Sequence, residues 1–453
     1  MNLKGLKAKI LNFNLFELGN SAIFYYLLIF YLAPFLALIG FSIKFSLINY
    51  QIPWQALGYV TLGLIFFIIG YFCPLRESLA KRMPNIFTGL WNLKRAMIAF
   101  WTFFGFGMVA KIIRLAAGGY FIKNNLKPLF ARSTFYSFIG YLDWFGCIAL
   151  AIALINYYYL RKIGNKDYRI WRLLAFGALL IEIAYGIPSC SRIAVIVPIL
   201  LYLLIKSFVF KIKYWEIALI SATIIFVLFP FGNICRNPSI LSAYQAIKPA
   251  NNQVPATNQK SAFNMSISSI NVSNTDDFLI DSFLARINQT AVFSKILEVP
   301  RDVIASYGSS LSNFLITLGP PRFIWKNKPL STNSLGNEFG RHLGILSPED
   351  SVTSVGPTII GDFYINFGIL GIILGMFLVG TAFRFIYDYL IKLTAVSSSG
   401  LLIYSVFWTQ LIKGMEDWIA PTWAGLVKLF VILLLLHLFL TKRQKIASNS
   451  ALR

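Results

Sequence analysis

Polar side chains that could bind a ligand or move a proton gather in one stretch of the chain, Ser309–Gly368. This stretch is also rich in glycine, proline and aromatic residues, and it runs directly into a long apolar segment. A polar, glycine-containing segment joined to apolar helices is a typical place for a membrane protein to handle its substrate. Prominent among its polar residues are Arg322, Lys326, Lys328, Glu338, Arg341, His342, Asp350 and Asp362.

Three of these side chains are candidate catalytic bases: Glu338, His342 and Asp362. A general base must reach the substrate hydroxyl and have a suitable pKa. If the segment is helical, Glu338 shares a face with Arg341 and His342, three and four residues further along. Asp362, in GDFYINFG, lies where we expect the backbone to re-enter the membrane. Each residue alone could be an ordinary surface residue, and we rank Glu338 and Asp362 above His342.

Basic residues form a second set of candidates, for binding an anion such as phosphate. Several arginines on one face suit this ligand, because a guanidinium group offers two parallel donors and stays charged. The alternative is that these side chains only reach the membrane interface from helix ends. For the group we favour anion binding, and we expect Arg192, Arg286, Arg322 and Arg341 to line one cavity. The full candidate set is Arg192, Arg286, Arg322, Arg341, Arg114 and Lys328.

The chain that must position these residues is strongly apolar. Of its 453 residues 57% are hydrophobic and 13% are charged, whereas a soluble protein has about 25% charged residues. Its apolar runs match the length of a membrane-spanning helix and lack the alternation of barrel strands. The sequence therefore predicts an all-α polytopic integral membrane protein. About ten transmembrane helices are expected, roughly at Ser21–Phe41, Gln55–Cys73, Ala96–Leu115, Phe135–Leu160, Leu173–Ile187, Arg192–Ile205, Trp215–Phe231, Phe363–Phe383, Leu401–Ile412 and Trp423–Leu440.

Charge predicts the orientation of these helices. The formal net charge is +23, and the basic residues lie mostly in short loops, so we attribute them to topology and expect no nucleic-acid partner. The positive-inside rule then makes both termini cytoplasmic and puts the long region Gly232–Pro357 outside. The predicted parts are a seven-helix bundle (1–231), a large periplasmic loop (232–357) and a three-helix bundle (358–453). An eleventh membrane segment results if Thr358–Tyr364 dips into the membrane.

The large loop is expected to be partly helical. Asn237–Asp277 is rich in Asn, Ser, Gln and Pro, which is typical of a flexible segment. Phe278–Pro300 has apolar residues at helical spacing and predicts an amphipathic helix. Val303–Gly319 predicts a second helix, lying on the membrane surface.

Two acidic residues are predicted within the membrane helices. Glu182 belongs to the fifth helix, where a carboxylate costs about 2.5 kcal/mol or more to insert. We expect it to pair with a cation such as Arg114 or Arg192, and coupling to proton movement is the alternative. Asp143, near the outer end of the fourth helix, is as readily explained by a structural role.

No part of the sequence predicts a cofactor. The cysteines Cys73, Cys147, Cys190 and Cys235 lack metal-ligand spacing, and two histidines are too few for a histidine-based metal site. Cys190 and Cys235 are both expected near the outer face and could form a disulfide. Phosphate-loop and nucleophile-elbow motifs are also missing from the sequence. We therefore expect chemistry that needs neither ATP nor a metal.

The segments PRFIWKNKP, LGNEFGRHLG and SPEDSVTSVGPTIIGDFYINFGILGIILGM resemble the Wzy-type O-antigen and exopolysaccharide repeat-unit polymerases. SCSR, which ends at Arg192, is similar to a Ser-Arg element of the same family. The resemblance implies a GT-C-like bundle in the bacterial inner membrane. It also implies a metal-independent glycosyltransferase that moves a growing glycan from polyprenyl pyrophosphate onto an incoming lipid-linked repeat unit.

The same resemblance implies roles for the candidate residues. Arginines would hold the pyrophosphate, a carboxylate or histidine would deprotonate the acceptor hydroxyl, and aromatic side chains would stack on sugars. A groove between membrane helices would hold the prenyl tails. The implied partners are polyprenyl-pyrophosphate-linked oligosaccharides in the lipid bilayer, with a chain-length regulator and a flippase as further candidates.

Three other functions remain open at this point. An O-antigen ligase would share the outer loop and the arginines, and His342 could serve as its loop histidine. A flippase or transporter of the same lipids would need charges inside the bundle, and many transporters contain internal repeats, of which we find none. A structural scaffold would not need so many outer arginines. The segments PRFIWKNKP and GDFYINFG favour the polymerase.

Overall fold

The structure is a computed structural model in which the described residues are almost entirely helical. It describes residues 14–39, 44–45, 48–49, 53–116, 134–187, 192–223, 287–300, 306–320, 324–325, 327–328, 332–346, 355–393 and 396–441. The two-residue strands β1 (Lys44–Phe45) and β2 (Ile48–Asn49) pair antiparallel. The helices are α2 (Leu18–Leu38), α3 (Trp54–Phe72), α4 (Leu75–Arg82), α5 (Leu93–Ala116), α7 (Thr134–Lys162), α8 (Tyr168–Gly186), α9 (Arg192–Val209), α10 (Tyr214–Thr223), α15 (Gln289–Glu298), α17 (Ser309–Leu318), α18 (Thr332–His342), α19 (Thr358–Tyr387), the π-helix η3 (Asp388–Lys392), α20 (Ser398–Gly414) and α21 (Ile419–Leu440).

Seven helical segments within the described ranges are long and apolar enough to cross a membrane. The predicted helices one to four, six, eight and ten coincide with them, which confirms a helical, multi-pass membrane protein. The fifth and ninth predicted helices coincide with α8 and α20. The described first part of the seventh predicted helix is α10. Those three are shorter or more polar, so the total of ten stays a prediction. The seven segments are Leu18–Leu38, Trp54–Phe72, Leu93–Ala116, Leu142–Lys162, Arg192–Val209, Thr358–Lys392 and Ile419–Leu440.

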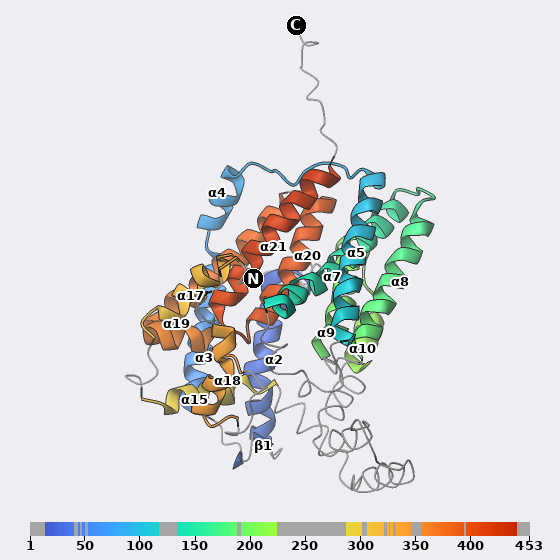
Figure 1. The fold of residues 1–453 in the computed structure, drawn as a ribbon. Helices are drawn as coiled ribbons and strands as arrows, with labels where there is room; N and C mark the ends of the chain where they lie inside the picture. Colours follow the sequence, from blue (N-terminus) through green and yellow to red (C-terminus); the bar gives the residue numbers. More distant parts are fainter. Residues whose placement is uncertain are drawn as a thin grey trace, which may run out of the picture.

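The bundle has two ends, which we name by the helices that lie there (Figure 1). The end with α4 and the last turn of α21 is the α4 end, and the end with α15 and α18 is the α18 end. The main-chain N–H of Asn92 donates to the carbonyl of Leu440 at 2.9 Å, so α5 begins beside the last turn of α21 at the α4 end. It follows that α5 finishes toward the α18 end.

Helix α19 folds back on itself at Gly368. That glycine has φ 63° and ψ −144°, a conformation that residues with a Cβ rarely adopt, and it divides α19 into a short arm, residues 358–367, and a long arm, residues 369–387. The ring of Phe363 in the short arm lies against Gly375 in the long arm. At about 1.5 Å per residue the short arm is about 15 Å long, half of a typical hydrocarbon core. The segment expected to dip into the membrane is therefore a separate helical arm.

The long arm of α19 packs closely against α3. A methyl group at Gly380 would overlap the carbonyl oxygen of Phe67, and one at Gly70 would overlap that of Phe377. The hydroxyl of Thr381 donates to the carbonyl of Gly70 at 3.1 Å across the same contact. Small residues and a hydroxyl group at the crossing are the usual way in which membrane helices approach each other.

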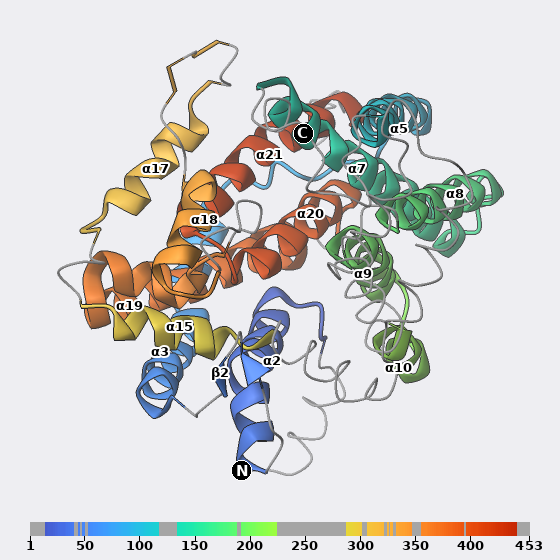
Figure 2. The same ribbon diagram turned by 60° about the horizontal axis from the view of Figure 1, so that its bottom comes forward.

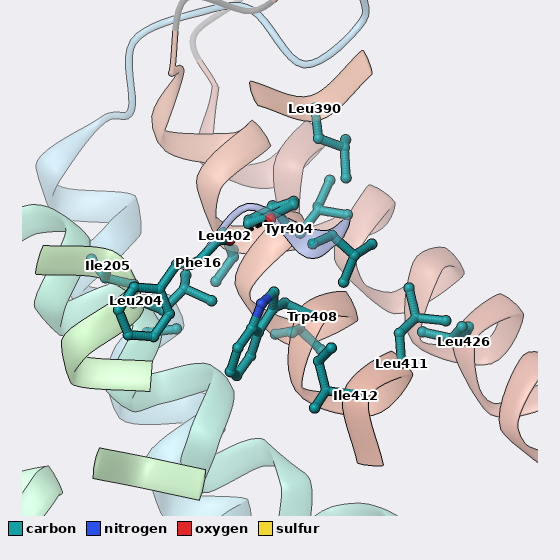
Figure 3. Packing of buried hydrophobic residues seen from close by; sticks show 14 of the residues in the cluster. Phe16, Leu204, Ile205, Leu390, Leu402, Tyr404, Trp408, Leu411, Ile412 and Leu426 are labelled. Carbon is teal, nitrogen blue, oxygen red and sulfur yellow. Dashed lines mark hydrogen bonds between the residues drawn. The ribbon is translucent and has the colours of Figure 1, made fainter. Parts of the chain in front are cut away.

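Side chains of α20 lie in the apolar core together with residues of α9 and α21 (Figure 3). Helix α20 packs against α7, α9 and α21. The Tyr404 hydroxyl donates to the carbonyl of Phe16 at 2.7 Å, and Trp408 Nε1 donates to Ser21 Oγ at 2.8 Å. The rings of Phe16 and Trp408 have centroids 5.7 Å apart. These contacts fix the beginning of α2 against the middle of α20.

An ion-pair cluster beside these contacts joins three helix ends. Arg384 of α19 pairs with Glu17, before α2, at 2.5 Å and with Asp388 of η3 at 3.0 Å. Its Nη1 also donates to the hydroxyl of Tyr71, at the end of α3, at 3.2 Å. We refer to Arg384, Glu17, Asp388 and Tyr71 as the Arg384 cluster. It gives the Arg384 guanidinium two carboxylate partners and joins the ends of α2, α3 and α19.

The short helices α15, α17 and α18 cover the bundle toward the α18 end. Helix α15 lies within the predicted amphipathic helix Phe278–Pro300 and packs against α2, α3 and α19. The Asn288 side chain caps it by accepting from the N–H of Ala291 at 3.2 Å. Helix α17 confirms the helix predicted in Val303–Gly319, and it packs against α21 and α19. The expected flexible segment Asn237–Asp277 lies outside the described residues.

Candidate functional site

Asp362, on the short arm of α19, is fully buried at the centre of a polar network. Its Oδ1 accepts hydrogen bonds from Ser310 Oγ of α17 at 2.8 Å and from Asn366 Nδ2 at 2.9 Å. Its Oδ2 accepts from the main-chain N–H of Ile419, the first residue of α21, at 2.9 Å. The carboxylate therefore joins α17, the short arm and α21.

The network continues through Asn366 into the turn before α17. Asn366 Oδ1 accepts from Ser306 Oγ at 2.9 Å and from the N–H of Gly308 at 3.0 Å. Two residues beside the network have positive φ, Tyr307 at 45° and the buried Thr358 at 68°. Such conformations cost about 1–3 kcal/mol each for residues other than glycine and persist where the surroundings impose them. Backbone of this kind is concentrated at functional sites.

The geometry supports a positioning role for Asp362. Both carboxylate oxygens already accept hydrogen bonds from the protein, and the side chain has no exposed surface. A catalytic base must come within hydrogen-bond reach of the substrate hydroxyl. Asp362 instead holds together the helices on which other candidates lie.

Glu338, Arg341 and His342 all lie on α18 and are exposed, as the helical spacing predicted. His342 Nδ1 lies 2.9 Å from the carbonyl oxygen of Glu338 one turn earlier, which fixes the imidazole ring. Phe339, on the more buried side of the helix, packs edge-on against Trp418 at the start of α21, with ring centroids 5.2 Å apart. Helix α18 thus presents a carboxylate, a guanidinium and an imidazole away from the bundle.

Lys328 caps the end of α17. Its Nζ donates to the carbonyl oxygens of Gly319 at 3.0 Å and Pro320 at 3.1 Å, and it lies 5.9 Å from the ring centre of Trp325. A cation at the carbonyl end of a helix satisfies orphan acceptors and the helix dipole. This geometry gives Lys328 a structural role in addition to the predicted contact with phosphate.

Arg114 belongs to a mixed-charge cluster formed by α5, α7 and α8. Its Nη1 pairs with Asp143 Oδ2 at 2.5 Å. Lys111, one turn earlier on α5, pairs with Asp143 Oδ1 at 3.3 Å and with Glu182 Oε1 at 2.9 Å. We expected Glu182 to pair with Arg114 or Arg192, and the structure corrects this: its partner is Lys111. Lys111 and Arg114 lie one turn apart on α5, so both reach Asp143, and Lys111 also reaches Glu182.

The predicted four-arginine cavity is only partly described. Arg192 begins α9, which packs against α7, α8 and α20, whereas Arg341 lies on α18 beside α21. Arg286 and Arg322 lie outside the described residues, as do Cys190 and Cys235. The shared cavity and the disulfide therefore stay predictions.

The described candidates form two groups when the α18 end is viewed (Figure 2). One group lies on α17, α18 and the short arm of α19, and the other lies on α5, α7, α8 and α9. Helices α20 and α21 lie between them. A site that uses both groups would extend across the face of the bundle.

Sequence reasoning missed several residues of this end. Ser310 and Asn366 hold Asp362, and Glu416, in the turn after α20, accepts a hydrogen bond from the hydroxyl of Tyr25. Asp417 Oδ1 in the same turn accepts from the N–H of Trp418 at 2.9 Å. The acidic pair in KGMEDW, between two apolar runs, is the signal that could have indicated this turn.

An apolar groove of about 780 Å³ lies between α2 and α3. It is walled mainly by aliphatic and aromatic side chains of the second half of α2 and the first turns of α3. Two polar side chains face it, Tyr31 and Thr61, and their hydroxyl oxygens are 2.8 Å apart. The groove lining includes Phe24, Leu27, Phe35, Leu38, Trp54 and Leu57.

Within the part of the chain that the structure describes, no group of three or more His, Cys, Asp or Glu residues could hold a metal ion. A family model described as a domain of unknown function (DUF8712) matches residues 125–447, well over half of the chain. No curated protein matches the chain, and no solved structure matches it.

Proposed function

The chain belongs to the DUF8712 family, and we propose that it is a membrane-embedded glycosyltransferase of the polymerase type. It transfers a glycan from polyprenyl pyrophosphate onto an incoming lipid-linked oligosaccharide repeat unit. In this proposal the α18 end faces outward from the bacterial plasma membrane, and both termini are cytoplasmic. A chain-length regulator and a flippase are its proposed partners.

The observation that carries the proposal is the short arm of α19 with its polar network. A half-length helix that ends in a non-helical glycine brings Asp362 and Asn366 into an otherwise apolar bundle. Broken helices at membrane depth are tolerated where protein or a water-filled cavity satisfies the backbone, and transporters use them to bind polar ligands. Here α18 packs against the start of α21, where the N–H of Ile419 donates to Asp362, and α18 carries exposed ionisable groups.

The two groups of candidates suit a reaction between two lipid-linked molecules. A polymerase must hold a donor and an acceptor at once, and each has a phosphorylated head and a long apolar tail. We assign the donor pyrophosphate to the arginines of the α5 and α9 group, Arg114 and Arg192, with Arg286 and Arg322 as further ligands. We assign the acceptor sugar to α18. The groove between α2 and α3 offers an apolar surface for one prenyl tail.

The chemistry proposed is a single displacement at the anomeric carbon. An acceptor hydroxyl oxygen forms the new bond to that carbon, and the bond from the carbon to the pyrophosphate oxygen breaks. Glu338 takes the hydroxyl proton, and arginines stabilise the negative charge on the departing polyprenyl pyrophosphate. Arg341 lies one turn from Glu338 and can keep the carboxylate oriented.

Deletion of the gene and electrophoresis of the surface glycan test the function. A polymerase deletion leaves single-repeat glycan on the surface, and the wild-type gene restores the ladder of longer chains. An unchanged ladder would exclude the polymerase.

The second candidate is an O-antigen ligase, and the exposed, ring-fixed His342 is the observation that favours it. In that case the deletion leaves no glycan attached to its final lipid acceptor on the cell surface. The polymer still accumulates on its polyprenyl carrier. Loss of both polymer and carrier-linked surface material would point to a flippase.

A further inference from the structure

Four residues with alternating charge form a continuous chain of contacts through three helices. In order of contact they are Arg114, Asp143, Lys111 and Glu182, and we call them the charge chain. Arg114 and Lys111 come from α5, Asp143 from α7 and Glu182 from α8. Two cations and two carboxylates give the chain no net charge.

The Arg114–Asp143 half of the charge chain is more exposed than the Lys111–Glu182 half. The side chain of Arg114 is 28% exposed and that of Asp143 is 20% exposed. Glu182 and Lys111 are only 6% and 2% exposed. The chain therefore begins in the protein interior with a buried ion pair and reaches the surface with a guanidinium, a group suited to phosphate.

The neighbouring residues leave room for the buried pair and hold it. Gly146 of α7 has no side chain where the pair passes, and a Cβ there would overlap the Glu182 carboxylate. The Lys111 ammonium also donates to the carbonyl oxygen of Asp143 at 3.3 Å and lies 5.0 Å from the ring centre of Tyr185. The position of Lys111 is thus fixed from several directions.

A buried pair of this kind often adds little to stability. Replacing a buried ion pair with neutral side chains of similar size often leaves stability unchanged, because desolvation offsets the attraction. Charged residues inside membrane helices are costly and mark functional sites by default. One contact in the charge chain bears on function: Asp143 pairs with Lys111 through one carboxylate oxygen and with Arg114 through the other.

We propose that Lys111 and Glu182 are positioning residues that keep Arg114 available to a lipid-linked pyrophosphate. With Lys111 present, one oxygen of Asp143 is occupied, and Asp143 holds Arg114 with the other oxygen. Without Lys111, both oxygens of Asp143 can turn to Arg114 in a bidentate pair, which neutralises the guanidinium and draws it away from the surface. Glu182 compensates the charge of Lys111, so that the ammonium can remain buried. The inference rests on the proposed function and specifies one of its binding groups.

The test is the double variant Lys111→Met with Glu182→Gln, which removes the buried pair and leaves the net charge unchanged. Purified protein in lipid nanodiscs is titrated with undecaprenyl pyrophosphate, and inorganic pyrophosphate is added as a competitor. We expect affinity for the lipid to fall roughly tenfold, within the range measured for residues of one network. We expect thermal stability to change little. In an Arg114→Lys background the double variant should cause no further loss.

The matched control is Glu17→Gln in the Arg384 cluster. This variant breaks a partly buried ion pair, with side chains 17% and 19% exposed, that shares no residue with the charge chain. It should lower thermal stability and leave affinity for undecaprenyl pyrophosphate unchanged. Glu182→Asp is a second probe if the double variant fails to fold, because it keeps every charge and shortens the reach to Lys111. We expect it to weaken binding by a smaller factor.

The outcomes separate this inference from the proposed function. If wild-type protein does not bind undecaprenyl pyrophosphate, the function and the inference both fall. If wild-type protein binds it and the double variant and Glu182→Asp bind equally well, only the inference is overturned. The inference is also overturned if the losses of binding free energy caused by Arg114→Lys and by the double variant are additive. Additive losses would show no coupling between the buried pair and Arg114.

Discussion

Asp362 on the short arm of α19 accepts a hydrogen bond from the main-chain N–H of Ile419, 57 residues later in the chain, at 2.9 Å. The first N–H groups of a helix have no partner within it, and a carboxylate is their best acceptor. One side chain thus caps α21 and, through Ser310, anchors α17. This contact connects the polar network to the helix that supports α18, and it determines how the candidate site is assembled.

Asp362→Asn should destabilise the protein by about 1–3 kcal/mol, because the amide nitrogen would face one of the donors that the carboxylate now accepts. The midpoint of thermal unfolding in detergent measures the change. Polymer synthesis should fall together with the amount of folded protein. A variant with wild-type stability and no polymer would instead make Asp362 the catalytic base.

Gly368→Ala should also destabilise the protein, by about 1–3 kcal/mol, because φ 63° with ψ −144° is strained for a residue with a Cβ. The matched control is Gly177→Ala on α8, where a Cβ meets nothing within 4 Å. Thermal unfolding of the two variants gives the comparison. Equal stability would mean that the two arms of α19 do not depend on this turn.

Glu338→Gln should reduce the rate of chain extension by about 10²–10⁴-fold, the usual contribution of a general base. Because Glu338 is exposed, its removal should not change thermal stability. Incorporation of labelled repeat units into polymer by purified protein measures the rate. Glu298→Gln on α15, at another largely exposed carboxylate, is the control and should extend chains normally.

His342→Asn separates the polymerase from the ligase. If Glu338 is the base, this variant keeps most of its polymerase activity, because the imidazole is hydrogen-bonded to a main-chain carbonyl within the described residues. The assay is the ladder of surface glycan in cells that carry the variant gene. A loss of glycan attachment with normal polymer on the carrier would support the ligase.

Cysteine labelling tests the orientation. In a chain whose four cysteines are replaced by alanine, a membrane-impermeant maleimide added outside should label Ser261→Cys and not Lys166→Cys. Detergent permeabilisation should expose Lys166→Cys to the reagent. The reverse pattern would place the α18 end in the cytoplasm and remove the basis for the proposed function.

The sequence by itself determined the class of the protein and the course of its helices. Apolar runs of membrane-spanning length are a local property, so the predicted spans coincide with α2, α3, α5, α7, α9, α19 and α21. The helical spacing of Glu338, Arg341 and His342 is local as well, and it placed them together on α18. The GDFYINFG segment likewise indicated that the backbone re-enters the membrane near Asp362.

Only the tertiary structure decided the partners of the buried polar groups. Asp362 meets Ser310 and Ile419 because three helices converge, and no spacing along the chain encodes that meeting. Glu182 pairs with Lys111 and not with Arg114 because of the positions of these residues on α5. Gly146, which has no side chain, leaves room for the pair. Hydrophobic periodicity specifies which face of a helix is buried, but several cations can satisfy one carboxylate. The packed geometry of neighbouring helices selects among them.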